Sequence, residues 1–279
     1  EEGRWVADSV LELKMREHDK NSDFAILYRT NAQSRAFEEA LRRQNIPYRI
    51  YGGMSFYQRK EIKDLLAYLK LTVNPYDEEA LKRIINYPAR GIGQTTIDKI
   101  IITANNENKR PWDILNEVQY YDIPTRTKNA VEEFVLMIKS FGAQAAKLNA
   151  YDLAKHIGST TKMVSELYND KTVEGVSRYE NVQELLNSIK EFVEEDVVQD
   201  DEVLSTDKGL GSFLQNVTLL TGDEKDAVNA DSVKLMTVHA AKGLEFKVVY
   251  VVGMEENLFP GQQSLYSLED LEEERRLFY

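Results

Sequence analysis

Strand-like apolar runs stand only near the two ends of this sequence, and a long stretch with helical periodicity separates them. Runs of this kind occupy 24–28 and 46–51 and return at 233–238 and 248–252. A helix-type pattern over 32–45 joins the first two runs, and strand, helix, strand is the unit that builds parallel sheets. The sequence therefore predicts an α/β fold with a parallel sheet whose strands come from both ends of the chain.

Between about 55 and 221 the apolar residues recur at helical spacing, and no convincing strand is found. A polar, acidic linker follows at 221–232. Because the ends of an inserted domain lie close together, we expect a sheet domain, 1–54 and 230–279, interrupted by an all-α insertion at 55–229. The helical stripes that carry this prediction are Ile62, Leu65, Leu66, Leu69 and Val73; Val131, Phe134, Val135 and Ile138; Val182, Leu185, Leu186, Ile189, Phe192 and Val193; and Leu210, Phe213, Leu214 and Val217.

The net charge of −12 argues at first against a nucleic-acid partner, since proteins that bind nucleic acid usually carry a basic surface. The average hides an asymmetry. Residues 1–110 hold 19 Lys and Arg against 16 Asp and Glu, whereas residues 111–279 hold 16 against 31. We expect any DNA-contacting surface mainly in the first 110 residues, although charge alone also fits an ordinary acidic protein.

The composition also indicates the cellular compartment of the protein and limits the kinds of metal site that it could form. The chain has no cysteine, which excludes thiolate metal sites and is typical of a reducing cytoplasm. Its three histidines, His18, His156 and His239, form no pair at ligand spacing, so no metal site is expected. The apolar runs are too short to span a membrane, and no secretory leader precedes them. The first residue is not methionine and the last helix pattern has no stop signal, so we expect a fragment of a longer cytoplasmic protein.

The stretch "TVHAAKGLEF" at 237–246 has the polar character of a ligand loop after a buried strand. Thr237, His239 and Lys242 could contact a backbone phosphate, and Glu245 could accept a hydrogen bond from a ribose hydroxyl. No Gly-Lys pair occurs anywhere in the chain, so this is not a phosphate-binding loop of the usual kind. A structural histidine near apolar residues is the commoner case, and both interpretations stay open.

A second polar cluster, "YRTNAQSR" at 28–35, lies where the first strand meets the next helix. Ligands of α/β sheets bind at the carboxyl ends of strands, so Arg29, Asn31, Gln33 and Arg35 are well placed for binding. The alternative is a helix cap made by Thr30 or Asn31, with arginines exposed to solvent. That alternative is stronger for Arg35 than for Arg29.

The stretch "PARGIGQTTIDKI" at 88–100 joins two helix patterns through Gly91, Ile92 and Gly93. Helix, Gly-apolar-Gly, helix is typical of turns whose backbone N–H groups bind a phosphate oxygen without reading the bases. Arg90 and the local basic balance favour the duplex-binding interpretation, with Thr95 at the start of the second helix. The alternative is an ordinary helix–helix turn with a buried Ile92.

Taken together, these stretches resemble the superfamily 1A DNA helicases of the UvrD/Rep/PcrA group, and within it most closely the PcrA branch of Gram-positive bacteria. The resemblance runs from about residue 24 to the end, and between about 111 and 220 it is only a helical pattern. It depends on long motifs in order: "YRTNAQSR", "PYRIYGGMSFYQRKEIKDLLAYLKL", "ARGIG", "LMTVHAAKGLEFKVVYVVGMEENLFP" and "LEEERRLFY". Gly261 in "FPGQQS" departs from the family pattern, which makes a DNA contact there doubtful.

The resemblance implies the second RecA-like domain (2A) of a 3′-to-5′ DNA helicase or translocase in DNA repair or plasmid replication, interrupted by a helical domain (2B). It also implies ATP and Mg²⁺ as cofactors of the full-length protein, with single-stranded and forked DNA as partners and repair or replication proteins at the insertion. The Walker motifs and the arginine finger would lie elsewhere, so no catalytic residue is expected here. The implied contacts are Arg29, Asn31, Thr237 and His239 to single-stranded DNA, Gly243 and Glu245 to ATP, and Arg90, Gly91, Ile92, Gly93 and Thr95 to duplex DNA.

Two other classes of function stay open. The excess of acidic residues after residue 110 also suits a non-catalytic DNA-binding or protein-docking module, with the helical block as an interaction surface. A nucleotide-binding enzyme of another type is weakly supported, because no other catalytic constellation occurs in the sequence.

Overall fold

A computed structural model of the chain describes residues 1–195, 197–199, 202–204, 207–221, 231–256, 258–261, 264–265 and 267–278. The chain divides into two compact units, which we call the sheet unit and the helical unit. The sheet unit comprises Glu1–Arg59 and Leu219–Tyr279, and the helical unit comprises Lys60–Thr218. The sequence placed these boundaries at 54/55 and 229/230.

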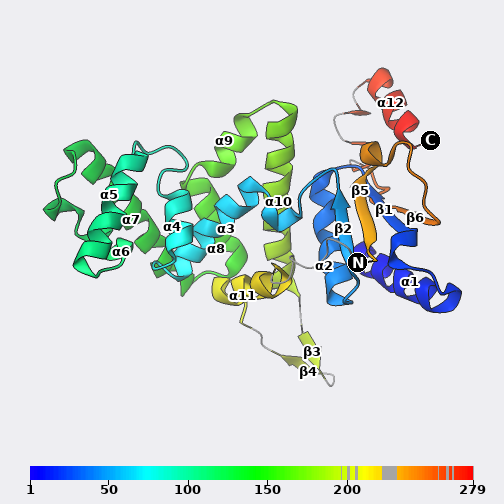
Figure 1. Ribbon diagram of the computed structural model, residues 1–279, viewed down its shortest axis with the longest axis horizontal. Helices are drawn as coiled ribbons and strands as arrows, with labels where there is room; N and C mark the ends of the chain where they lie inside the picture. Colours follow the sequence, from blue (N-terminus) through cyan, green and yellow to red (C-terminus); the bar gives the residue numbers. More distant parts are fainter. Residues whose placement is uncertain are drawn as a thin grey trace. The chain divides into compact units, whose positions relative to one another are not determined.

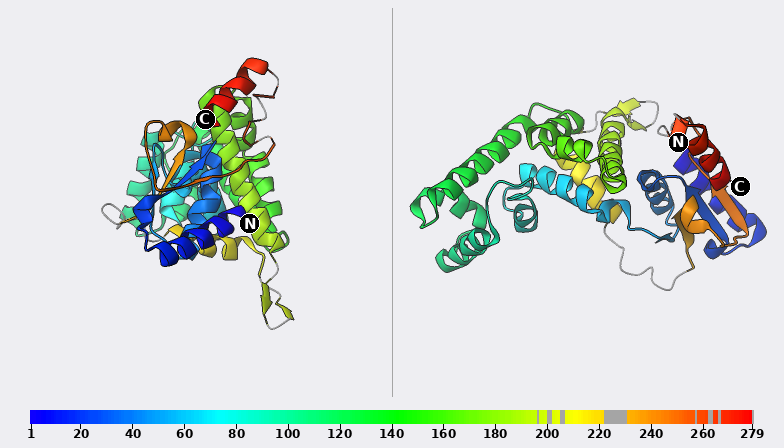
Figure 2. Two further views of the ribbon diagram at one scale, coloured as in Figure 1. Left: turned by 90° about the vertical axis from the view of Figure 1, so that its right-hand side faces the viewer. Right: turned by 90° about the horizontal axis from the view of Figure 1, so that it is seen from above.

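The sheet unit contains a four-stranded parallel sheet in the order β2-β5-β1-β6, which confirms the predicted α/β fold class. The two strands from the end of the chain, drawn in orange, lie beside the two from its beginning, drawn in blue (Figures 1 and 2). The strands are β1 (Phe24–Tyr28), β2 (Tyr48–Tyr51), β5 (Val233–Thr237) and β6 (Val248–Val251).

The expected strand–helix–strand unit forms, but its two strands are not neighbours. The helix α2 (Ser34–Arg43) connects β1 to β2, and β5 lies between them and pairs with both. The reason lies in the composition of the strands. All five residues of β1 are apolar or aromatic and four are buried, so β1 needs a partner on each side, whereas Arg49 of β2 is exposed and suits an edge strand.

Two helices cover one face of this sheet (Figure 1). Helix α1 (Glu2–Glu17) and α2 pack against each other and place their apolar residues on the strands. The remaining elements of the unit are α12 (Leu268–Phe278) and the short 3₁₀ turns η1 (Asn21–Asp23), η2 (Asn31–Gln33), η3 (Phe56–Gln58) and η5 (Val238–Ala241). The core consists of Val6, Val10, Phe37 and Leu41 from the helices and Phe24, Ile26, Tyr28, Val233 and Leu235 from the strands.

The helical unit confirms the predicted insertion, with one correction. The expectation of no strand between 55 and 221 is wrong, because β3 (Val197–Gln199) and β4 (Glu202–Leu204) form an antiparallel pair. Each strand has three residues, too few to show an alternating pattern in the sequence. The helices are α3 (Lys60–Val73), α4 (Glu78–Ile84), α5 (Gln94–Glu107), α6 (Pro111–Asn116), α7 (Thr125–Ala145), α8 (Ala150–Thr160), α9 (Met163–Asn169), α10 (Val173–Glu194) and α11 (Leu210–Thr221), with the 3₁₀ turn η4 (Val118–Tyr120).

The predicted apolar stripes face the interior of the helical unit, with few departures. Val73 is 47% exposed because α3 ends there, and Phe192, Val193 and Leu214 are only partly buried. The other members of the four stripes are buried. In the described part of the chain, no helix is both long enough and apolar enough to cross a membrane. Most of the predicted linker, 222–230, lies outside the described residues.

Residues 55–59 belong to the sheet unit because α2 holds them with a buried carboxylate. Glu38 is 3% exposed, and its carboxylate accepts hydrogen bonds from Ser55 Oγ at 2.7 Å and from the Phe56 N–H at 3.0 Å. Arg59 donates to Ser34 Oγ at 2.8 Å, on the same helix. These bonds satisfy groups that would otherwise be buried without partners, which explains why the first boundary follows Arg59 rather than residue 54.

We expect a Glu38→Gln variant to change how stability depends on pH. Burial raises the pKa of the Glu38 carboxyl, partly offset by the hydrogen bonds from Ser55, Ser34 and Phe56. The folded chain therefore holds this proton more tightly than the unfolded chain, and the stability that this group contributes at low pH is lost as the pH rises through the raised pKa. Glutamine resembles the neutral acid, so the melting temperature of the variant relative to the parent should rise between about pH 4 and about pH 8. Thermal melts across this range measure the difference, and a constant difference would contradict the expectation.

Candidate functional site

Four strands end at one edge of the sheet, and the segments that follow them contact one another there. Because all strands are parallel, their carboxyl ends share this edge. A Cβ atom on Gly52, after β2, would lie 3.3 Å from Ala240 Cβ in η5, and one on Gly53 would lie 3.7 Å from Asn31 Oδ1 in η2. After β6, Gly253 lies against the amide of Gln33. The edge is thus a continuous surface made from all four strand ends, and we call it the carboxyl edge.

Three of the four residues expected to contact single-stranded DNA are available at the carboxyl edge. Asn31 and His239 are exposed, and Thr237 is half-buried. The Thr237 hydroxyl accepts a hydrogen bond from the Ala240 N–H at 3.3 Å, which caps η5. Its own O–H remains able to donate to a phosphate oxygen. Residues from two distant parts of the sequence thus lie on one surface, as the parallel sheet requires.

Arg29, the fourth of these residues, is held by an acidic partner. Its Nε donates to Glu274 Oε2 at 2.9 Å, and its Nη2 donates to Oε1 of the same carboxylate. The Glu274 side chain is 6% exposed, and the hydrogen bonds from Arg29 lower its pKa. The backbone of Gly261 also bonds this carboxylate, and Ser264 Oγ donates to it at 3.3 Å. Arg29 therefore fastens α12 and the preceding loop to the end of β1 through a two-pronged bond to one carboxylate.

The other polar residues of "YRTNAQSR" support the backbone. Thr30 is the N-cap residue of η2, as the capping alternative expected, and Gln33 Oε1 accepts the Thr30 N–H at 2.8 Å to complete a capping box. Arg35 is 5% exposed and pairs with Glu39 at 3.1 Å, so it is not the solvent-exposed arginine that the capping alternative expected.

The residues expected at ATP lie in the loop after η5. Gly243 has φ +80, and both Gly243 and Glu245 are exposed. Among the described residues, none hydrogen-bonds to the Glu245 carboxylate, so both oxygens can accept bonds from ribose hydroxyls. Lys242 is exposed as well. The expected contact of Gly243 and Glu245 with ATP stays a prediction, with both residues accessible to a ligand.

In the helical unit, the turn from Pro88 to Gly93 presents its glycines to solvent. Ile92 is fully buried, and Asn86 Oδ1 accepts both its N–H at 3.1 Å and the Arg90 N–H at 2.9 Å. Gly91 and Gly93 are exposed, as is Thr95 in the first turn of α5. Gly91 has φ +78, which a residue with a side chain rarely adopts. The exposed backbone at the start of α5 can therefore approach an anion closely.

The Ile92 side chain is buried and the Arg90 side chain is half-buried and bonded within the unit, so the expected duplex contact of these two residues stays a prediction. The Arg90 guanidinium donates to the carbonyl oxygens of Ile84 at 2.9 Å and Pro88 at 3.2 Å, and to the Tyr68 hydroxyl. Burial raises the pKa of Tyr68 to about 12, so this hydroxyl stays neutral at physiological pH. Arg90 supports the turn from inside the unit, since its fork of donors matches several carbonyls at once.

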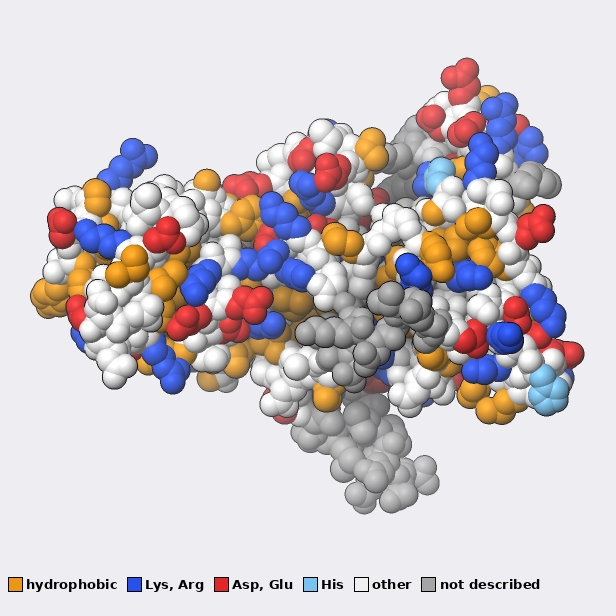
Figure 3. Space-filling model, viewed as in Figure 1, with side chains coloured by type: hydrophobic (Ala, Val, Ile, Leu, Met, Phe, Trp, Pro, Cys, Tyr) orange, Lys and Arg blue, Asp and Glu red, His pale blue; other side chains and the backbone are white. Residues whose placement is uncertain are grey.

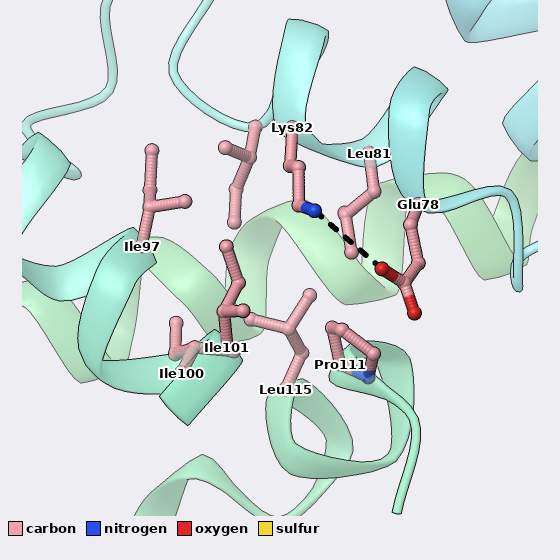
Figure 4. Close-up of a pocket in the computed structure, with 9 residues that line it drawn as sticks. Glu78, Leu81, Lys82, Ile97, Ile100, Ile101, Pro111 and Leu115 are labelled. Atoms are coloured by element: carbon pink, nitrogen blue, oxygen red, sulfur yellow. Dashed lines mark hydrogen bonds and ion pairs between the residues drawn. The ribbon is translucent and has the colours of Figure 1, made fainter. Parts of the chain in front are cut away.

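A small apolar cavity of about 10 Å³ lies between α4, α5 and α6 (Figure 4). Leu81, Ile97, Ile100 and Leu115 point toward it, and the Lys82–Glu78 ion pair of 3.5 Å lies at its rim. Its walls lack the convergent polar groups that a nucleotide or a metal ion would need. It is best understood as imperfect packing between the helices that present the turn.

The distribution of charged side chains limits how the helical unit could bind DNA, and the arrangement of possible metal ligands limits where an ion could bind. On the face of the helical unit seen in Figure 3, basic and acidic side chains are interspersed. A duplex contact there would therefore depend on backbone donors more than on a basic field. Within the described ranges, no group of three or more His, Cys, Asp or Glu side chains is arranged to hold a metal ion.

Sequence reasoning missed the residues that position the site. Asn86 holds the glycine turn at 88–93, and Glu274 holds Arg29. Glu38 holds the segment after β2. Each is a polar residue within a helical pattern, where exposure to solvent is the usual expectation. No local signal in the sequence distinguishes them from surface residues.

The chain was compared with known proteins. The family model described as "UvrD-like helicase C-terminal domain" matches residues 1–279. The chain is 39% identical to ATP-dependent DNA helicase PcrA of Bacillus subtilis, over 100% of this chain and 37% of the relative. It is 39% identical to DNA helicase II of Escherichia coli, over 92% of this chain and 35% of that protein. It is 36% identical to the PcrA helicase of Staphylococcus epidermidis, over 100% of this chain and 37% of that relative.

The chain thus spans little more than a third of the length of the curated relatives that it matches. The family match covers both the carboxyl edge of the sheet unit and the glycine turn of the helical unit. The match agrees with the parallel sheet, its helical insertion and the order of the motifs along the sequence. The chain belongs to the family of UvrD-like helicase C-terminal domains.

Proposed function

We propose that this chain is the DNA-gripping part of an ATP-dependent DNA helicase or translocase that moves 3′ to 5′ along single-stranded DNA. The observation that carries the proposal is the carboxyl edge, where Asn31, Thr237 and His239 lie on one exposed surface. The relatives are named as DNA helicases, and those of the PcrA type as ATP-dependent. Such a grip should tolerate any base sequence, because the donors available here suit the backbone of the strand.

We further propose that the helical unit contacts the duplex ahead of the separated strands, through Gly91, Gly93 and Thr95. Their exposure supports this role, and the inward side chains of Arg90 and Ile92 give the turn a rigid base. Repair or replication proteins would bind elsewhere on the same acidic unit. If the chain bound such proteins and no DNA, it would be the docking module that its acidic charge also permits.

The loop with Gly243 and Glu245 would contribute to the ATP site of the full-length protein, in which Mg²⁺ accompanies the nucleotide. ATP would supply the free energy of phosphoryl transfer for movement along DNA. In this chain, the exposed Glu245 carboxylate would orient the ribose, while the η5 turn before it would contact the DNA strand. One loop would then contact both ligands, which suits coupling between nucleotide state and DNA grip.

Replacing Asn31 or His239 by alanine should weaken single-strand binding. Each change removes a hydrogen-bonding group from the carboxyl edge, and a loss of about 1 kcal/mol corresponds to an affinity about fivefold lower. Fluorescence anisotropy with a labelled oligo-dT measures the affinity. Asn106→Ala, which removes an exposed amide from α5, is the control and should leave binding unchanged. Equal affinities for all three variants and the parent would contradict the assignment.

Gly93→Ala should weaken duplex binding without loss of stability. A Cβ there would have Thr95 Oγ1 as its nearest neighbour, at 3.9 Å, so the folded chain accommodates it and only an approaching phosphate would meet the methyl group. We expect duplex affinity to fall about fivefold while the free energy of unfolding changes by less than about 0.5 kcal/mol. Gly211→Ala, also in open space, is the matched control. Unchanged duplex affinity in Gly93→Ala would refute the proposed contact.

The purified 279-residue chain should hydrolyse no ATP, with or without DNA. The reason is that its sequence contains no Gly-Lys pair and hence no phosphate-binding loop. A phosphate-release assay, run on protein whose binding to oligo-dT has been verified, measures this. DNA-stimulated turnover above the protein-free rate would contradict the prediction.

A further inference from the structure

The loop after β6 is held at Gly253 by two elements that lie far from it in the sequence. The Gly253 N–H donates to the two carboxylate oxygens of Glu2, the first residue of α1, at 3.1 and 3.2 Å. The side-chain amide of Gln33 occupies the space that a Cβ atom on Gly253 would need. The start of α1 and the turn after β1 therefore meet at one glycine.

The same amide orders the backbone that carries Asn31. Gln33 Oε1 accepts the Thr30 N–H at 2.8 Å, which closes the capping box of η2. Asn31 is the first residue of this turn, and its side chain is exposed. Because Oε1 and Nε2 belong to one planar amide, a shift of Nε2 away from Gly253 also displaces Oε1 from Thr30. The contact at Gly253 thus holds Asn31 in place.

Glycine is required at position 253 for two reasons. Its φ is +68, which residues with a side chain rarely adopt, and a Cβ atom would collide with Gln33 Nε2. The colliding atom is the far end of a flexible side chain, so the folded chain would accommodate a methyl group by moving the Gln33 amide. The cap of η2 would then open, and Asn31 would lose its fixed position at the carboxyl edge.

We propose that Glu2 and Gly253 are positioning residues for the single-strand grip, although neither contacts DNA. They act through Gln33, which orders η2 and holds Asn31 in its binding position. A group that is ordered in advance loses less conformational entropy when the strand binds. This role depends on the proposed single-strand grip of the carboxyl edge. It brings α1, which lies outside the sequence motifs, into the support of that grip.

Gly253→Ala should lower the affinity for a labelled oligo-dT on the order of fivefold, because η2 is no longer ordered before the strand binds. Fluorescence anisotropy measures the affinity. Hydrogen exchange over 28–33 measures the opening of the cap, and the Thr30 amide should exchange faster in the variant. Gly211→Ala, where a Cβ atom meets nothing within 4 Å, is the matched control and should change neither measurement.

The Glu2 carboxylate offers a second and milder change. Glu2→Ala removes the acceptor of the Gly253 N–H, and oligo-dT affinity should fall about twofold. Glu1→Ala is the matched control, because Glu1 is the adjacent acidic residue, is exposed and makes no side-chain cap bond. Thermal melts measure the stability of each variant. A purely structural role would lower the melting temperature and leave the affinity unchanged.

Double variants test whether the effect passes through Gln33 to Asn31. In a Gln33→Ala or an Asn31→Ala background, Gly253→Ala should lower the affinity no further, because the group through which it acts is already absent. A further loss of similar size in either background would show an independent effect and would overturn the proposal.

The outcomes also separate this role from the grip itself. If Asn31→Ala weakens binding while Gly253→Ala and Glu2→Ala bind like the parent, the positioning role is wrong and the grip stands. If Asn31→Ala binds like the parent, the proposed contact of Asn31 fails and the positioning role fails with it. An effect of Gly253→Ala alone overturns the part assigned to Glu2. Weaker binding by both variants, with no further loss from Gly253→Ala in either background, supports the proposal.

Discussion

The pairing of β5 with both β1 and β2 is the interaction on which the rest of the sheet unit depends. Val233 and Leu235 of β5 are fully buried, and they join Phe24 and Ile26 of β1 in one core. Without β5, the two early strands would have no contact through the sheet, because they are not neighbours. The chain must therefore bring its two ends together before this core closes, which carries the entropic cost of a long loop.

The same pairing creates the functional surface. Parallel strands bring their carboxyl ends to one edge, so Asn31 after β1 and His239 after β5 become neighbours of the Gly52–Met54 turn after β2. Buried polar groups then hold this edge in place. Glu38 fixes the segment after β2, and Glu274 fixes the end of β1 through Arg29. In the helical unit, Arg90 and Asn86 perform the corresponding task for the glycine turn.

These supporting residues show why charge and polarity in the sequence were an incomplete guide to the site. Arg29 was expected to contact DNA from the family resemblance, and Arg90 from its place beside the glycine turn and the local basic balance. In the folded chain, Arg29 meets a carboxylate and Arg90 meets carbonyl oxygens, because buried donors and acceptors are nearly always paired. By contrast, Gly91 and Gly93 of the glycine turn are exposed, as their pattern in the sequence indicated.

By itself, the sequence determined the α/β class, the helical insertion, the buried stripes and the family, because periodicity and long motifs are local properties. The position of β5 between β1 and β2, the short β3–β4 pair and the partners of Arg29 and Arg90 were decided only by the tertiary structure. The β3–β4 pair is local but too short to show a pattern, whereas the position of β5 and the partner of Arg29 depend on groups far away along the chain. Those partners are separated along the chain by as many as 245 positions, as between Arg29 and Glu274, and no local pattern can record such a pairing.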